Sequence, residues 1–196
     1  MSDNSETLLS PSKLNMIDRR EILKLGLAGT LASVVPLGLS STSAHASARN
    51  TWRVGFRHAH TGESFNGVYR VGDKYLPEAF ERLNYVLRDF RTGEVFPMDP
   101  RVIDIMALVQ KKANVRGPMT IFSGYRSPKT NNRLRKNTSG VAKNSFHMYG
   151  QALDMHIDNY STRNLCSIAK DLRAGGVGYY PKSQFVHVDT GSVRSW

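Results

Sequence analysis

Two histidines and one aspartate stand at positions where they could share a metal ion. His147 lies in a stretch without regular periodicity, Asp154 in the strand-like segment that follows, and His187 in a later strand-like segment. Gly150 permits a sharp return of the chain between the first two. If the segments with Asp154 and His187 are neighbouring strands, about 4.8 Å apart, the three side chains can meet. A catalytic zinc uses three such ligands and keeps one position for water.

The spacing is also compatible with unrelated surface or capping groups, so these residues alone do not decide whether a metal site exists. The helical H-E-x-x-H zinc motif is absent from the sequence. Cys166 is the only cysteine, which excludes an internal disulfide and a cysteine-rich zinc site. Any metal centre must therefore use histidine and carboxylate ligands.

The periodicity of the sequence predicts one α+β domain, with a small antiparallel sheet and helices packed on one of its faces. Apolar residues that recur every three or four positions predict helices from 76 to near Gly93, from Pro100 to 113 and from Ser161 to 174, and a short basic helix begins at Ser127-Pro128. Alternating or short apolar segments predict strands at 51–57, 119–122, 152–157, 177–180 and 185–189. A hairpin or loop is expected at 62–73, and a loop at 142–150.

One ten-residue stretch has a distinctive pattern, S-x-H-x-x-G-x-A-x-D at 145–154. It resembles the zinc motif of the LAS peptidases, the family that groups lysostaphin-type, D-Ala-D-Ala carboxypeptidase and hedgehog-like folds. Essentially all of 51–196 is similar to the YcbK (MepK) murein endopeptidase group of that family. The supporting segments are HTGE at 60–63, SGYRS at 123–127, GVAK at 140–143, RAGGVGYYP at 173–181 and FVHVDTG at 185–191.

The resemblance implies one Zn²⁺ ion bound by His147, Asp154 and His187, and hydrolysis of amide bonds in peptidoglycan cross-links. It also implies that Arg126 binds a substrate carboxylate or stabilises the developing oxyanion. The alternative for Arg126 is a structural salt bridge.

The general base is less clear from the resemblance. In the dipeptidase and carboxypeptidase branches a glutamate three residues before the last ligand often has this role, and here that position is Gln184. The catalytic candidates are therefore Asp189 and His156, since each lies two residues along a strand from a metal ligand and on its face. Asp189 could equally well orient a ligand histidine.

The first 46 residues differ in kind from the rest. Arg19-Arg20 precede an apolar stretch at 25–39, and Ala44-His45-Ala46 is a small-residue cleavage pattern. The stretch has 15 residues, whereas a membrane-spanning helix needs about 20. The segment resembles a twin-arginine export signal. We therefore expect a signal peptide at 1–46 cleaved near Ala46, export to the periplasm by the twin-arginine machinery, no stable membrane insertion after cleavage, and a single zinc peptidase domain at 47–196.

The chain carries 27 Lys+Arg against 16 Asp+Glu, a net charge of +11. Segment 1–46 is neutral, so the charge lies in the remainder and favours an anionic polymer. For an exported protein we expect the cell wall rather than nucleic acid as this partner. A basic stretch precedes the zinc motif and is either a solvated face or a region attracted to the wall: Lys129, Arg133, Arg135, Lys136 and Lys143.

The leading hypothesis is a zinc-dependent murein endopeptidase that acts in cell-wall remodelling. The alternatives are a non-catalytic, zinc-containing wall-binding module, a D,D- or L,D-carboxypeptidase of the same fold, and a secreted nucleic-acid binder. The last would bind DNA with a steep dependence on salt.

Overall fold

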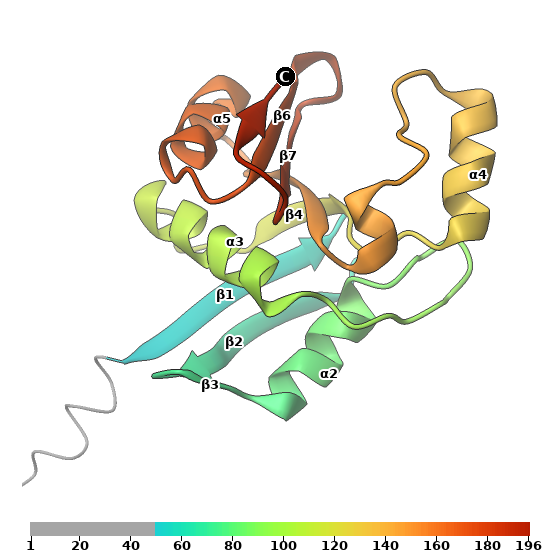
Figure 1. Ribbon diagram of the computed structural model, residues 1–196. Coiled ribbons are helices and arrows are strands. Elements are labelled where there is room, and N and C mark those ends of the chain that lie inside the picture. The colour runs from blue at the N-terminus through green and yellow to red at the C-terminus, as the bar shows by residue number, and fades with distance from the viewer. Residues whose placement is uncertain (1–49) are drawn as a thin grey trace, which may run out of the picture. The chain divides into compact units, whose positions relative to one another are not determined.

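The computed structural model describes residues 50–196 (Figure 1), and the predicted signal segment at 1–46 lies outside them. These residues form an eight-stranded sheet with the order β3-β2-β1-β4-β5-β7-β6-β8. The strands are β1 (Thr51–His58), β2 (Ser64–Val71), β3 (Lys74–Tyr75), β4 (Met119–Ser123), β5 (Ala152–His156), β6 (Gly176–Tyr180), β7 (Phe185–Asp189) and β8 (Arg194–Ser195). The helices are α2 (Pro77–Val86), α3 (Pro100–Lys112), α4 (Pro128–Asn137) and α5 (Thr162–Asp171), with 3-10 turns η1 (Phe146–Tyr149) and η2 (Pro181–Ser183).

The sheet is mixed. Most neighbouring strands are antiparallel, but β4 runs parallel to β1 and β8 runs parallel to β6. Parallel neighbours require a long crossover connection, and the chain between β1 and β4 supplies it with α2 and α3. The predicted α+β class is confirmed, while the sheet is larger and less uniform than predicted. The segment predicted as a hairpin or loop belongs to it as β2 and β3, since β2 pairs with β1 along its whole length.

Helices α2, α3 and α5 cover one face of the sheet, as predicted. Helix α3 contacts β1, β7 and α5, and α5 contacts β6 and β7. Tyr69 of β2 joins α2 and α3 on this face, because its ring lies 6.4 Å from that of Phe80 and its hydroxyl donates to Asp104 at 2.8 Å. Leu153 and Met155 of β5 are fully buried in the core on the same side.

Local signals determine where the helices begin. The Asp99 carboxylate caps α3 by accepting a hydrogen bond from the Arg101 amide at 2.9 Å, and a proline occupies the first helical position. Ser127 and Ser161 cap α4 and α5 in the same way. Helix α2 ends earlier than predicted, because the Leu87 carbonyl accepts from the Tyr125 amide, at 2.8 Å, instead of from a further helical turn.

The opposite face of the sheet carries polar side chains near the middle of the strands. Side chains alternate along a strand, so Asp154 of β5 and His187 of β7 point away from the helix-covered core. Turn η1, the loop that follows α4 and the last residues of the chain complete this side. Within residues 50–196, no helix combines the length and apolar character that a membrane crossing requires.

Candidate metal centre

The turn η1 presents His147. Ser145 precedes the turn in an extended conformation, and Gly150 closes it with φ of +65°, in the left-handed region. A Cβ atom at Gly150 would also collide with the Pro97 carbonyl oxygen. The glycine of the S-x-H-x-x-G-x-A-x-D pattern is therefore required both for its φ angle and for this close approach.

Backbone groups of the Ser-Gly-Tyr-Arg segment at 123–126 fix the His147 ring. Its Nδ1 lies 2.8 Å from the Gly124 carbonyl oxygen, which can only accept, so Nδ1 carries the proton. The Arg126 amide donates to the His147 carbonyl at 3.1 Å. Nε2 of His147 is thereby left as the nitrogen that is free to bind a cation.

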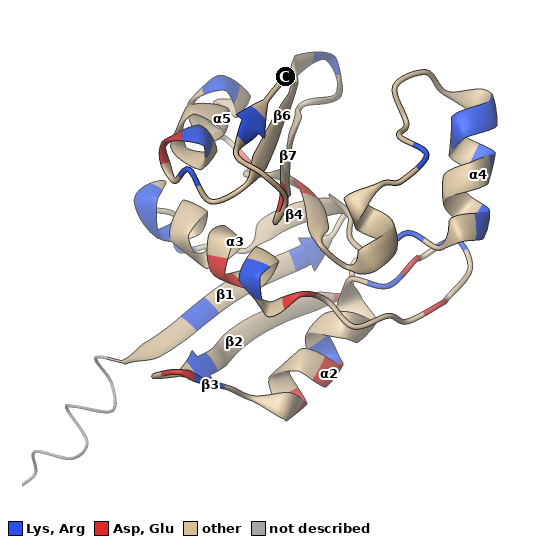
Figure 2. Ribbon diagram, in the orientation of Figure 1, with Lys and Arg blue, Asp and Glu red and all other residues tan. Residues whose placement is uncertain are grey.

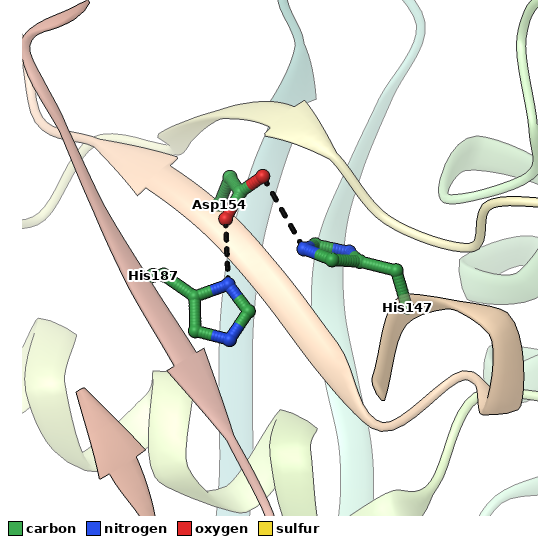
Figure 3. A group of neighbouring side chains, drawn as sticks. All are labelled: His147, Asp154 and His187. Atoms are coloured by element: carbon green, nitrogen blue, oxygen red, sulfur yellow. Dashed lines mark hydrogen bonds and ion pairs between the residues drawn. The ribbon is translucent and has the colours of Figure 1, made fainter. Parts of the chain in front are cut away.

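Asp154 and His187 face each other across neighbouring strands. β5 and β7 pair antiparallel with Asp154 opposite His187, which is the adjacency that the sequence required. His187 Nδ1 lies 2.8 Å from Asp154 Oδ1, and His147 Nε2 lies 3.3 Å from Asp154 Oδ2. Figure 3 shows the carboxylate between the two imidazoles.

The three side chains fit a metal site. Each offers one donor atom, these atoms all lie within 4.8 Å of one another, and all three residues are buried. At zinc–ligand distances of about 2.0–2.2 Å, two atoms bound to one ion lie at most about 4.4 Å apart, so small side-chain rotations suffice. Two imidazoles and a carboxylate are a typical donor set for zinc. Within residues 50–196 no other group of three His, Cys, Asp or Glu side chains has this spacing.

The charges of this cluster are strongly coupled. Burial raises the pKa of Asp154, but the two histidines outweigh burial and hold that pKa well below its usual range. Burial lowers the pKa of His187, yet hydrogen bonds to Asp154 and Asp189 overcome this effect and raise it to about 9. Burial dominates for His147 and lowers its pKa. In the metal-free protein, His187 is thus the protonated member of the cluster at neutral pH.

Asp189 is fully buried behind His187. Its Oδ2 lies 3.1 Å from His187 Nε2 and accepts from Arg194 Nη2 at 2.7 Å. Its Oδ1 accepts from Arg194 Nη1 at 3.0 Å and from the amides of Gly176 and Gly191 at 3.3 and 2.9 Å. Burial raises the pKa of Asp189, but these partners, His187 first, hold it well below its usual range. A carboxylate engaged in this way is suited to orienting His187 rather than to accepting a proton.

Arg126 lies at the edge of the cluster. Its Nη2 lies 3.8 Å from Asp154 Oδ2 and 3.3 Å from Ser123 Oγ, and its Nη1 lies 3.5 Å from Asn131 Oδ1. Its Nε is buried and has no hydrogen-bond partner among the described residues. Burial lowers the pKa of the guanidinium, and the negative charge of Asp154 opposes this effect. The side chain therefore holds a positive charge and a free donor beside the cluster.

The cluster opens into a cavity of about 730 Å³. One side is formed by the loop after α4, which contributes residues 138–142, 144 and 145. Aromatic rings form another part of the lining: Tyr180 stacks on Phe185 with centroids 4.5 Å apart, and Trp196 Nε1 donates to the Tyr180 hydroxyl at 2.9 Å. The carboxylates in this lining are those of Asp154 and Asp189. Asp154 already contacts the two histidines, and Asp189 already contacts His187 and Arg194.

The structure brings together every predicted site residue except His156. His156 lies on the strand face of Asp154, but its ring lies beside Phe122, with centroids 6.4 Å apart, and it is not part of the cavity lining. Its Nε2 lies 3.8 Å from Asp158 Oδ1. Gln184, at the position of the expected glutamate, is exposed and ends η2 with φ of +54°.

Two residues of the site were missed by the sequence analysis, Arg194 and Trp196. The Arg194 guanidinium lies between rings, 5.3 Å from the centroid of Phe146 and 5.0 Å from that of Trp196. The Trp196 ring lies 5.4 Å from that of His187. The available signal was their spacing of two residues, which places both on one strand face. No local pattern predicts that this short strand, β8, returns to pair with β6.

Comparison with known proteins agrees with this geometry. Residues 46–196 match the family Peptidase_M15_2, described as peptidoglycan L,D-endopeptidase MepK. The chain belongs to the MepK family. This membership confirms the family predicted from the motif at 145–154 and from the SGYRS and FVHVDTG segments.

Two MepK relatives align over nearly their whole length. Peptidoglycan L,D-endopeptidase MepK of Escherichia coli strain K12 is 39% identical over 179 residues, which cover 91% of this chain and 97% of the relative. The probable MepK of Haemophilus influenzae is 37% identical over 186 residues, 93% of this chain and 98% of the relative. Zinc D-Ala-D-Ala carboxypeptidase of Streptomyces albus G is 27% identical over 146 residues, 68% of this chain and 54% of that protein.

Proposed function

We propose that this MepK family member is a zinc-dependent murein endopeptidase, which hydrolyses amide bonds in the peptide cross-links of peptidoglycan. The observation that carries the proposal is the buried His147, Asp154 and His187 cluster, which lines a cavity together with Arg126. The names of the relatives, peptidoglycan L,D-endopeptidase and zinc D-Ala-D-Ala carboxypeptidase, support the substrate class and the metal.

In this proposal one zinc ion per chain is bound by His147 Nε2, the Asp154 carboxylate and His187 Nδ1. The Gly124 carbonyl and the Asp189 carboxylate hold the other ring nitrogens, so each imidazole presents one defined nitrogen. Zinc held there would act as a Lewis acid on the scissile carbonyl and lower the pKa of a bound water toward about 7.

Arg126 would bind the substrate next to this centre. Its planar donors can hold a carboxylate of the substrate or stabilise the negative charge that develops on the carbonyl oxygen. The unpaired Nε and the long contacts of both terminal nitrogens leave it capacity for such a ligand. Asp189 is assigned the orienting role, and His156, outside the cavity lining, is assigned no role in catalysis.

The names of the relatives also favour one of the two cross-links that the sequence left open. An L,D bond joins the L-centre of one diaminopimelate to the D-centre of the next, whereas the bond from D-alanine to diaminopimelate is a D,D bond. We therefore expect cleavage of the diaminopimelate–diaminopimelate cross-link.

Cleavage of purified muropeptide dimers tests the function. Dimers with each type of cross-link are incubated with the protein, with and without a chelator, and the products are separated by liquid chromatography. Release of monomers that stops with the chelator and returns with zinc supports the endopeptidase. Loss of single terminal residues from monomers would identify a carboxypeptidase instead, and binding without any cleavage would identify a wall-binding module.

The proposed function also implies the compartment in which the protein acts. A wall hydrolase acts outside the cytoplasmic membrane, so we propose that residues 1–46 are a cleaved twin-arginine signal and that 47–196 form the peptidase domain in the periplasm. Changing Arg19 and Arg20 to lysine tests this: the unprocessed protein is expected to accumulate in the cytoplasm, as detected by fractionation.

Zinc affinity is expected to rise with pH. The pKa of His187 is raised to about 9, so a proton occupies this ring below that pH and must leave when the metal binds. One released proton corresponds to about a tenfold gain in affinity per pH unit, up to the pKa. Chelator competition between pH 6.5 and 8.5 measures this slope. A dissociation constant that is constant over this range would contradict the proposed His187 ligand atom.

Replacing Arg194 with alanine is expected to weaken zinc binding by about 10- to 100-fold, the effect typical of losing an outer partner of a metal ligand. The variant leaves the buried Asp189 carboxylate without its two guanidinium bonds, and Asp189 then holds His187 less firmly. Arg194→Lys, which keeps the charge but not the paired donors, is expected to be intermediate. Chelator competition measures the affinity, and equal affinities in all three proteins would contradict the orienting role of Asp189.

A further inference from the structure

The described residues carry an unbalanced positive surface beside the cavity. No Asp or Glu occurs between Asp104 and Asp154. Within that interval, α4 and the loop after it carry a group that we call the α4 basic surface, Lys129, Arg133, Arg135, Lys136 and Lys143, and all five are exposed. Figure 2 shows α4 with blue segments and no red one.

Helix α4 is held by polar anchors on its other side. The Ser127 hydroxyl and amide both donate to the buried Asp89 carboxylate, at 2.7 and 3.0 Å. Asn131 is buried, and its amide donates to the carbonyls of Ala142 and Lys143 at 3.1 and 3.3 Å. These anchors fix α4 against the domain and leave its charged side facing solvent.

The basic side chains repel one another and find no compensation within residues 50–196. No ion pair formed by the described residues includes any of the five. Lys129 and Arg133 are four residues apart on the helix, and Arg133 and Lys136 three, spacings at which like charges destabilise a helix. Lys129 also stands in the first turn of α4, where a positive charge interacts unfavourably with the helix dipole, and the turn itself contains no acidic residue. An external anion would relieve both effects.

The α4 basic surface adjoins the candidate active site. Residues 138–142 of the loop that Asn131 anchors line the cavity, and so does Arg126, whose Nη1 lies 3.5 Å from Asn131 Oδ1. Arg91 is a further neighbour: burial lowers its pKa, Asp89 opposes this, and the positive charges of Arg126 and Arg133 lower it further. Positive charge therefore extends from α4 to the edge of the metal cluster.

We propose that the α4 basic surface is a binding site for the free carboxylates of uncut stem peptides in polymeric peptidoglycan, which lie beside the bond being cleaved. This inference rests on the proposed function. Several weak charge contacts to one polymer add up, because the first contact raises the local concentration for the next. A soluble dimer offers few such contacts, whereas a polymer offers many.

The composition of α4 favours peptidoglycan over an anionic membrane as the partner. A helix that binds the surface of a membrane inserts an apolar face between the lipids. Leu134 is the one large apolar residue of α4, and it is partly buried against the domain. The surface thus offers charge without an inserting face.

Two triple variants with the same net charge test the proposal. Lys129→Gln/Arg133→Gln/Lys136→Gln removes three charges from α4. Its matched control, Lys111→Gln/Lys112→Gln/Arg116→Gln, removes three exposed charges from the end of α3 and the residues after it, away from α4 in Figure 1. Each protein is assayed on intact sacculi and on soluble cross-linked dimers at low and high salt, and its binding to sacculi is measured by pelleting with the metal removed.

The α4 variant is expected to lose about tenfold in kcat/KM and in binding on sacculi at low salt, because three weak, exposed charge contacts are removed. Its activity on dimers, and the control variant on both substrates, are expected to stay at the wild-type level. High salt should lower the kcat/KM and the binding of the wild type on sacculi to the level of the α4 variant. If the triple variant does not fold, Arg135→Gln/Lys143→Gln serves in its place.

Three results would overturn the proposal: equal losses in the α4 and control variants, equal losses on dimers and sacculi, or no loss on sacculi. Binding to phosphatidylglycerol vesicles that depends on α4, with unchanged binding to sacculi, would assign the surface to a membrane instead. Failure of the wild type to cleave dimers refutes the proposed function alone, since pelleting reports the α4 basic surface independently of activity.

Discussion

His187→Ala is expected to strip the protein of its metal and to lower kcat/KM on cross-linked dimers by about 10³-fold or more. A bound metal supplies several kcal/mol of transition-state stabilisation, and each 1.4 kcal/mol corresponds to about a tenfold change in rate. The variant also leaves Asp154 and Asp189 buried without the imidazole that lies between them. Metal content by mass spectrometry and dimer cleavage by chromatography measure the two effects.

His156→Ala is the matched control for this experiment. It removes an imidazole from the strand that carries Asp154, but from a ring that lies beside Phe122 and outside the cavity lining. We expect it to keep its metal and most of its activity. A loss comparable to that of His187→Ala would restore His156 as a candidate base, and retention of metal by His187→Ala would refute the proposed ligand set.

Arg126→Ala is expected to lower kcat/KM by about 10²- to 10³-fold, the range for losing one donor to a developing oxyanion. The metal content is expected to stay at the wild-type level, because Arg126 contacts Asp154 only at 3.8 Å. Dimer kinetics and metal analysis on the same preparation separate this result from that of His187→Ala.

Arg126→Lys, together with Arg126→Ala, distinguishes a role in substrate binding or oxyanion stabilisation from a purely structural salt bridge. Lysine keeps the charge but loses the planar pair of donors, so it should recover part of the activity if a charge suffices. The bonds to Ser123 and Asn131 are lost in either variant, so thermal midpoints are compared as well. Full activity of Arg126→Ala with a lowered midpoint would assign Arg126 to a structural salt bridge.

The part of the fold that depends on local signals could be predicted from the sequence. Asp99-Pro100, Ser127-Pro128 and Ser161 each mark a helix start, because an N-cap side chain acts on amides two or three residues away. Alternation along each strand could place Asp154 with His156 and His187 with Asp189, whereas the contact between Asp154 and His187 depended on the pairing of β5 with β7.

Long-range pairing could not be predicted in the same way. The extent of β2 depends on its partner β1, and the glycines within 62–73 indicated a turn region instead. The end of α2 depends on a bond from Tyr125, which is distant in sequence. Arg194 reaches the site because β8 pairs with β6. His156 satisfied the same alternation rule as Asp154, yet it lies beside Phe122 and outside the cavity lining.

The two sides of the cavity differ in how firmly they are attached. The strands β5 and β7 belong to a hydrogen-bonded sheet backed by the core, whereas residues 139–144 are tied to the rest of the described chain by the two hydrogen bonds from Asn131. A single side-chain amide therefore holds this side of the entrance, whereas the strands that carry Asp154 and His187 are held by the sheet.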